Sequence, residues 1–183
     1  MKDFISSYLI EGELCKKDQL LILLGLFSAR REEEKLKVVA QLAAEDGITL
    51  AQMADLISSA IISRGIPTWL SGMEALQAVA ALKPSMSFND ALHMETFRIV
   101  EECVHYYQTE FAEVPAWVNY LIDYAPTILL HYSNLRTVAL ADSQVPRRLK
   151  ELLLYAINVC DRYPKGIAIH KTNAMQLGAT EEI

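Results

Sequence analysis

Proline and glycine residues divide this chain into segments of helical length, and their spacing is the feature that most constrains the fold. Five prolines each stand at the start of a stretch of helix-forming residues, where a fixed φ and a missing N–H are tolerated: Pro67, Pro115, Pro126, Pro146 and Pro164. No segment shows sustained alternation of apolar and polar residues, so we expect no sheet. The pattern predicts an all-α fold with short connections. The expected helices cover residues 16–27, 31–44, 50–64, 67–82, 88–113, 115–124, 126–139, 146–162 and 164–178.

Local patterns support several of these boundaries. Apolar residues from Leu36 to Ala43 recur at three- and four-residue steps, as on the buried face of an amphipathic helix. Thr49 and Gln52 have the spacing of a capping box, in which each side chain accepts a hydrogen bond from the backbone of the other, and they predict a helix start at residue 50. Ser87 is suited to cap the helix that follows it.

The charge of the chain limits the partners it can have. Its 183 residues include 17 Lys and Arg against 23 Asp and Glu, which gives a net charge of −6 and a pI near 5.2. Nucleic acids and anionic membrane surfaces attract basic proteins, so neither is an expected partner. The length suits one domain over residues 1–183.

Apolar residues make up 52% of the chain, which raises the question of a membrane span. The densest run, Leu20 to Phe27, is far shorter than the roughly 20 residues that a spanning helix needs. The N-terminal segment MKDFISSYLIEGE carries acids where a secretory signal has a basic region. Three widely spaced cysteines fit reduced thiols rather than a disulfide framework. We therefore expect a cytoplasmic protein whose apolar excess fills a helical core or an interface between subunits.

A weak internal repeat relates the two ends of the chain. The segment from Lys16 to Leu21 aligns with that from Arg147 to Leu152. At the same offset, Gly47-Ile48-Thr49 aligns with Gly178-Ala179-Thr180. Amphipathic helices also align by chance, so duplication and coincidence are both open at this point.

A duplication would define two repeat units, residues 14–82 and 145–183, joined by helices within 88–140. The second unit ends where the counterpart of the 50–64 helix would begin. We then expect the N-terminal segment or another subunit to cover its exposed face.

The most informative pattern lies in residues 146–183. Lys150-Glu151-Leu152 precedes His170, which is followed by Ala174-x3-Gly178-Ala179-Thr180-x-Glu182-Ile183. This arrangement resembles the carboxymuconolactone decarboxylase and alkylhydroperoxidase D-like family. That family has a basic-x-Lys-Glu-Leu helix, then Cys-x-x-Cys-x-x-x-His, then Ala-x-x-x-Gly-Ala-Thr-x-Glu-Ile. The resemblance implies an alkylhydroperoxidase D-like helical bundle with Glu151 and His170 at its site.

The two cysteine positions of the family motif differ in this chain. Tyr163 and Gly166 occupy them, in the sequence Tyr163-Pro164-Lys165-Gly166. In redox-active members two thiols at a helix start form a disulfide, and the helix N-terminus and nearby cations stabilise the attacking thiolate. Because both sulfurs are missing from this motif, we do not expect dithiol alkylhydroperoxidase activity.

The remaining residues of the motif favour acid–base chemistry. A carboxylate beside an imidazole can transfer protons, and the resemblance implies that Glu151 faces His170. If Pro164 begins the last helix, the N–H groups of its first turn can attract a carboxylate or phosphate. We therefore expect a lyase- or isomerase-type reaction on a small carboxylate, without a cofactor. The candidate catalytic residues are Glu151 and His170, and the candidate substrate-binding residues are Tyr163, Lys165, Gly166 and Cys160.

Two other functions are consistent with the same residues. A Glu–His pair can be a structural hydrogen bond between helices, and Glu151 could be a solvated partner of Arg147 one turn earlier, in a non-catalytic helical binding or scaffold protein. Alternatively, Cys160 lies one turn before Tyr163 and could act as a single peroxidatic thiol through a sulfenic acid. An isolated cysteine more often packs as a small apolar residue.

The sequence predicts no metal site. Glu102 and His105 have the Glu-x-x-His spacing of di-iron bundles, but those sites need two such pairs and further carboxylates. Members of the family commonly form trimers or assemblies of trimers. The resemblance, together with the apolar composition, therefore implies a homo-oligomer, either a trimer or a hexamer.

Overall fold

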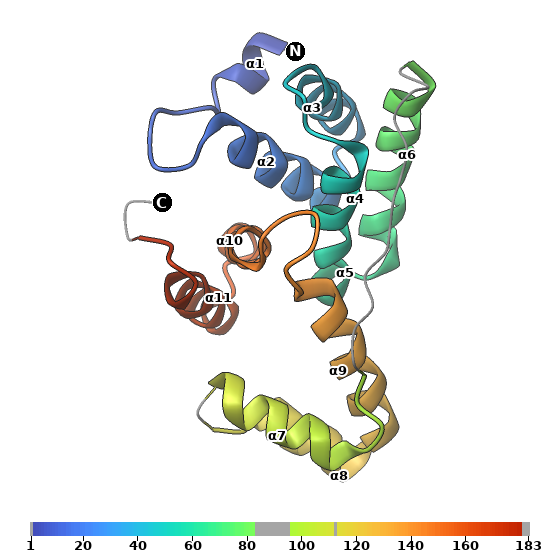
Figure 1. Ribbon diagram of the computed structural model, residues 1–183, viewed down its shortest axis with the longest axis vertical. Coiled ribbons are helices and arrows are strands. Elements are labelled where there is room, and N and C mark those ends of the chain that lie inside the picture. The colour runs from blue at the N-terminus through green and yellow to red at the C-terminus, as the bar shows by residue number, and fades with distance from the viewer. Residues whose placement is uncertain (1, 83–95, 112, 181–183) are drawn as a thin grey trace. The chain divides into compact units, whose positions relative to one another are not determined.

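The computed structural model describes residues 2–82, 96–111 and 113–180, and in these ranges it contains helices and no strands, which confirms the all-α prediction (Figure 1). None of the described helices is both long enough and apolar enough to cross a membrane. The helices are α1 (Lys2–Ser6), α2 (Lys16–Arg30), α3 (Glu33–Glu45), α4 (Leu50–Ser59), α5 (Ile61–Arg64), α6 (Ile66–Leu82), α7 (Val100–Phe111), α8 (Ala116–Tyr124), α9 (Pro126–Leu140), α10 (Arg147–Cys160) and α11 (Pro164–Gln176).

The chain forms two compact units. Unit 1 combines Met1–Ala91 with Leu140–Ile183, and unit 2 consists of Leu92–Ala139. Unit 1 is therefore discontinuous in sequence, and unit 2 is inserted between its two parts.

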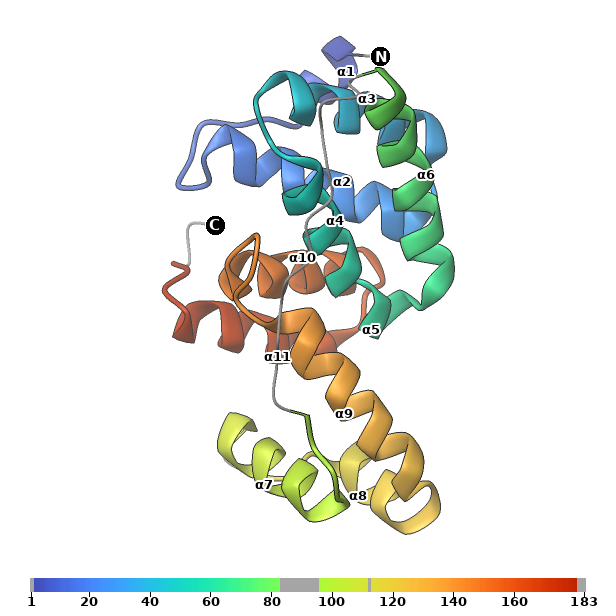
Figure 2. The same cartoon turned by 45° about the vertical axis from the view of Figure 1, so that its right-hand side comes forward.

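The core of unit 1 is built around α2. Leu20, Leu24 and Phe27 lie on one face of this helix and are buried. Helices α3, α4 and α6 pack against α2, and α6 also packs against α3 and α4. Helix α10 packs on α2 as well as on α11, as Figures 1 and 2 show from two sides. At the closest approach Gly25 lies directly against Leu153 of α10, so that a Cβ at this position would be only 2.4 Å from a Leu153 methyl group.

The helix boundaries follow local signals in the sequence. Thr49 Oγ1 accepts a hydrogen bond from Gln52 N at 3.1 Å, and Gln52 Oε1 accepts one from Thr49 N at 3.0 Å, so the predicted capping box is present at the start of α4. Pro164 occupies the first turn of α11. Helix α1 was not predicted from the sequence, because its five residues are too short for helical periodicity to be visible.

Two helical hairpins of unit 1, α2–α3 and α10–α11, have the same backbone pattern at positions 131 residues apart. Arg31 and Arg162, the left-handed residues after α2 and α10, have φ values of 57° and 55°. Gly47 and Gly178, which follow α3 and α11, have φ values of 82° and 89°. These left-handed residues thus recur at the offset of the sequence alignment, and we define counterparts in the two hairpins by this offset of 131 residues.

The loops that precede the two hairpins are also held in matching ways. Gln19 Nε2 donates to Ile10 O across 2.8 Å, and its counterpart Lys150 donates from Nζ to Ala141 O across 2.7 Å. Lys150 is fully buried and also bonds Asp55 Oδ1 at 2.9 Å. This ion pair ties the start of α10 to α4.

Unit 2 has a small core of its own. Cys103, Tyr107, Val118 and Leu129 are buried, and several aromatic rings pack around Tyr107. The Tyr107 hydroxyl lies 3.2 Å from Ser133 Oγ. Burial raises the pKa of the Cys103 thiol and of the Tyr107 phenol, and the Ser133 hydroxyl opposes both shifts only in part.

The helix expected over 88–113 begins later in the structure. Ser87 and residues 88–95 lie outside the described ranges, residues 96–99 are not helical, and α7 starts at Val100. Asn134 accepts a hydrogen bond from Phe97 N at 2.6 Å and donates to Phe97 O, and Glu102 accepts from Arg98 N. These side chains satisfy backbone groups that a longer helix would have bonded internally, so the helix cannot extend back to residue 96.

Candidate functional site

The structure brings together two residues that the sequence places nineteen positions apart, Glu151 of α10 and His170 of α11. Glu151 Oε2 lies 2.7 Å from His170 Nδ1. The Glu151 side chain has no solvent exposure, whereas that of His170 is 12% exposed. The pair is therefore a buried carboxylate bonded to an imidazole that still reaches the surface.

The second carboxylate oxygen of Glu151 also meets donors. Asn173 Nδ2 donates to Oε1 across 3.2 Å, and Arg147 Nε lies 3.7 Å from the same oxygen. Glu151 thus contacts both His170 and Arg147 and is not a solvated partner of Arg147. Because Asn173 follows His170 by three residues on one helix, both side chains reach the same carboxylate.

The first hairpin carries apolar residues at the counterparts of Glu151, His170 and Asn173. These are Leu20, Val39 and Leu42, of which Leu20 and Val39 are fully buried in the core. The same backbone therefore packs with an entirely apolar set in one copy. Burying a carboxylate costs free energy that hydrogen bonds offset only in part, so packing alone does not require the polar set of the second hairpin.

The start of α11 has little free space. Gly166 is buried, and a Cβ at this position would lie 2.1 Å from Asn158 Oδ1 and 2.8 Å from Tyr163 Cδ1. Lys165 is exposed and Tyr163 is 53% exposed. Gly166 therefore serves the close packing of α11 against α10, and Lys165 and Tyr163 present their side chains to the surface beside it.

Cys160, at the end of α10, is exposed. The nearby guanidinium of Arg30 is paired with Glu32, whose Oε1 lies 2.7 Å from Arg30 Nε. No hydrogen bond or ion pair between Cys160 and the Glu151–His170 pair is present among the described contacts.

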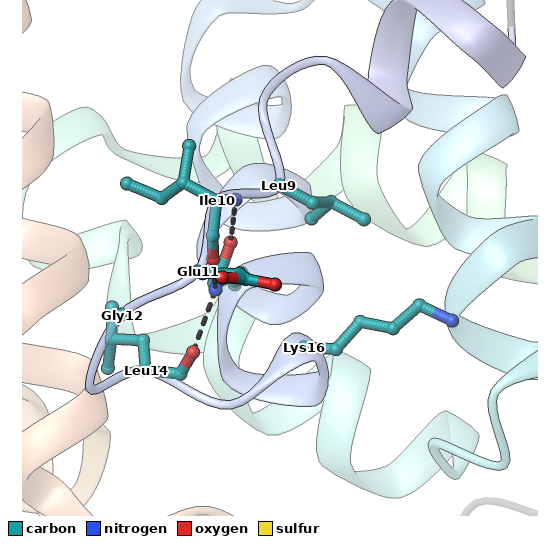
Figure 3. Close-up of a pocket in the computed structure, with 7 residues that line it drawn as sticks. Leu9, Ile10, Glu11, Gly12, Leu14 and Lys16 are labelled. Carbon is teal, nitrogen blue, oxygen red and sulfur yellow. Dashed lines mark hydrogen bonds between the residues drawn. The ribbon is translucent and has the colours of Figure 1, made fainter.

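A surface hollow of about 410 Å³ lies elsewhere, at the loop before α2 (Figure 3). The side chain of Gln19 fixes this loop, because it bonds Ile10 N and O and Leu14 O. None of the candidate site residues predicted from the sequence lines this hollow. The lining residues are Leu9, Ile10, Glu11, Gly12, Leu14, Lys16 and Gln19.

Within the described residues, no group of three or more His, Cys, Asp and Glu side chains is arranged to hold a metal ion. Glu102, which has the Glu-x-x-His spacing with His105, accepts hydrogen bonds from the backbone N–H groups of Arg98 and Ile99 at the start of α7. Its carboxylate therefore caps a helix.

Comparison of the sequence with models of known protein families and with curated proteins gives no match. The resemblance therefore depends on the residues of the 146–183 segment, of which Glu182 and Ile183 lie outside the described ranges.

Sequence reasoning missed Asn173 as a member of the site. Its spacing from His170 was a usable signal, since residues three apart on a helix share a face. The family motif directs attention to the glutamate and the histidine and leaves position 173 open.

Proposed function

We propose that this chain is a non-redox acid–base enzyme similar to the carboxymuconolactone decarboxylase and alkylhydroperoxidase D-like family, acting on a small carboxylate. The observation that carries the proposal is the buried Glu151 carboxylate bonded at 2.7 Å to the partly exposed imidazole of His170. A carboxylate behind an imidazole fixes the orientation of the ring and the nitrogen that carries its hydrogen. Tyr163 and Gly166 stand at the cysteine positions of the family motif, so the proposal includes no dithiol peroxidase step.

The solvent exposures of the Glu151 and His170 side chains assign different roles to these two residues. Only the imidazole reaches solvent, so His170 is the group that contacts substrate, and Glu151 acts through it. In an isomerisation, the imidazole takes a proton from one carbon of the substrate and returns it to another. In a decarboxylation, the imidazolium delivers a proton to the carbon that loses CO₂. The exposed ammonium of Lys165, in the first turn of α11, supplies a positive charge for the substrate carboxylate.

The internal comparison between the hairpins favours this function over a purely structural role for the pair. Leu20 and Val39, the counterparts of Glu151 and His170, are fully buried, so this hairpin backbone packs well without polar groups at the two positions. A group of buried polar side chains that stability does not require is typical of a functional site.

The proposal is tested by a thermal-shift screen of small mono- and dicarboxylates, with a ligand that binds the folded state raising the melting temperature. We expect at least one carboxylate to stabilise the wild type and not the His170→Ala variant. His131→Ala removes an exposed histidine of unit 2 and should behave as wild type. Binding that survives in His170→Ala would contradict the proposal, and peroxide turnover that Cys160→Ser abolishes would favour a thiol peroxidase instead.

A second candidate, a helical binding protein that self-associates, is favoured by the surface of unit 2. Tyr120 and Tyr124, one turn apart on α8, are 66% and 83% exposed, and Ile128 of α9 is 61% exposed. Exposed apolar groups of this size are typical of interaction surfaces. Sedimentation velocity at micromolar concentration tests self-association, and sedimentation as a 20.6 kDa monomer would contradict it.

A further inference from the structure

The contacts of Glu151 include a residue to which the proposed function gives no role. Asn173 is 5% exposed and lies one turn after His170 on α11. Its Nδ2 donates to Glu151 Oε1 across 3.2 Å, and Arg147 Nε approaches the same oxygen at 3.7 Å. Oε1 therefore faces two donors, while Oε2 faces His170 Nδ1.

These donors favour the ionised form of the carboxyl group. The Asn173 amide N–H and the Arg147 guanidinium can only donate, so Oε1 must accept. Hydrogen bonds of this kind and a nearby positive charge stabilise the ionised form of a carboxyl group. An ionised Glu151 has no proton to give, so the hydrogen between Oε2 and Nδ1 belongs to His170.

We propose that Asn173 is a positioning residue, which together with Arg147 keeps Glu151 ionised and oriented so that neutral His170 carries its proton on Nδ1 and presents Nε2 as the proton acceptor. The inference rests on the proposed function, in which His170 exchanges a proton with substrate. The Nε2 lone pair accepts that proton, and the resulting imidazolium keeps its Nδ1–H bonded to the Glu151 carboxylate. Return of the proton from Nε2 restores the starting pair.

The first hairpin provides a control within the same chain. The counterpart of Asn173 is Leu42, which packs against the core of unit 1. A leucine at this position is therefore compatible with the backbone. We attribute the amide at position 173 to its hydrogen bond with the Glu151 carboxylate.

Nitrogen NMR of the imidazole rings tests the proposal without any ligand. At a pH where His170 is neutral, the spectrum shows which ring nitrogen carries the hydrogen, and loss of signals in His170→Gln identifies the ring. We expect the hydrogen on Nδ1 in the wild type. In Asn173→Leu, where Oε1 loses a donor, the carboxyl group should take up a proton from solvent and keep it on Oε2. Nδ1 then accepts a hydrogen bond from this carboxyl group and the ring hydrogen moves to Nε2, so the share of rings with hydrogen on Nε2 should rise. Gln176→Leu, an exposed change on the same helix, should leave the ring unchanged.

Two results would overturn the inference. One is a wild-type His170 whose hydrogen sits on Nε2, and the other is a folded Asn173→Leu protein with an unaltered ring. Asn173→Ala removes the same donor without adding volume and replaces the leucine variant if that variant does not fold. A failure of every carboxylate to bind would contradict the proposed function and leave the NMR result interpretable by itself.

Discussion

Replacing the polar set of the second hairpin by its apolar counterparts should cost less stability than removing one member of it. The triple variant Glu151→Leu/His170→Val/Asn173→Leu copies the residues of the first hairpin, of which Leu20 and Val39 are fully buried and Leu42 packs against the same core. It removes the buried carboxylate together with His170 and Asn173, which hydrogen-bond to it, and keeps Arg147, whose side chain is 23% exposed.

The expected changes in the free energy of unfolding differ clearly between the variants. His170→Val alone leaves the fully buried Glu151 carboxylate without its shortest hydrogen bond, and breaking a buried pair from one side costs about 3–5 kcal/mol. Glu151→Leu alone leaves His170 Nδ1 and Asn173 Nδ2 without their shared acceptor, at about 1–3 kcal/mol for each. Replacing a whole buried polar set by apolar residues ranges from no change to a gain of about 1–4 kcal/mol.

Urea unfolding measures these differences, with the midpoint and the slope fitted together. Each unit contains one of the two tryptophans, Trp69 in unit 1 and Trp117 in unit 2. In a Trp117→Phe background, fluorescence therefore reports unit 1, which holds the site. The reasoning is refuted if the triple variant is less stable than His170→Val, because the polar set would then be required for packing.

Three further predictions concern single positions. Gly166→Ala should lower the melting temperature, since the new Cβ would lie 2.1 Å from Asn158 Oδ1 and such overpacking costs about 1–3 kcal/mol. Gly12→Ala, where a Cβ would have no atom within 4 Å, should leave the melting temperature unchanged, and equal melting temperatures of the two variants would contradict this prediction. Lys150→Met should cost about 3–5 kcal/mol in chemical unfolding because it leaves the Asp55 carboxylate without its cation. Lys16→Met, in an ion pair whose lysine is 61% exposed, should cost less than about 1 kcal/mol, and a similar loss in both variants would argue against the role of burial. Burial raises the pKa of Cys103, so at pH 8 iodoacetamide should alkylate the two exposed cysteines rapidly and Cys103 only after unfolding; three equally fast thiols would disprove it.

The sequence predicted most helices because their boundaries depend on local chemistry. The capping box at Thr49 and Gln52 and the proline at the first turn of α11 act within one helical turn, and both appear in the structure as expected. The predicted start of α7 was wrong because it depends on a contact that is distant in the sequence. Asn134, which holds Phe97 outside the helix, is 37 residues away, so no local pattern announces its effect.

The candidate site was predictable to a similar extent. The resemblance pointed to Glu151 and His170, and they meet in the structure. It did not indicate the complete burial of Glu151 or the contact with Asn173, because both depend on how α10 packs between α2 and α11. The register between the two hairpins could be aligned from sequence, but the shared left-handed residues Arg31 and Arg162 are visible only in the backbone.

Two separate stretches of the chain form unit 1, and contacts between their side chains hold it together. An unbroken chain is therefore not needed to keep its core assembled. Asp55 and Lys150, 95 positions apart, are joined by an ion pair, and α10 packs on α2 through Gly25 and Leu153. A single proteolytic cut inside unit 2 would therefore leave two fragments that share one core. Such fragments should remain associated after cleavage, and separately expressed halves divided within unit 2 should reassemble into a complementing pair.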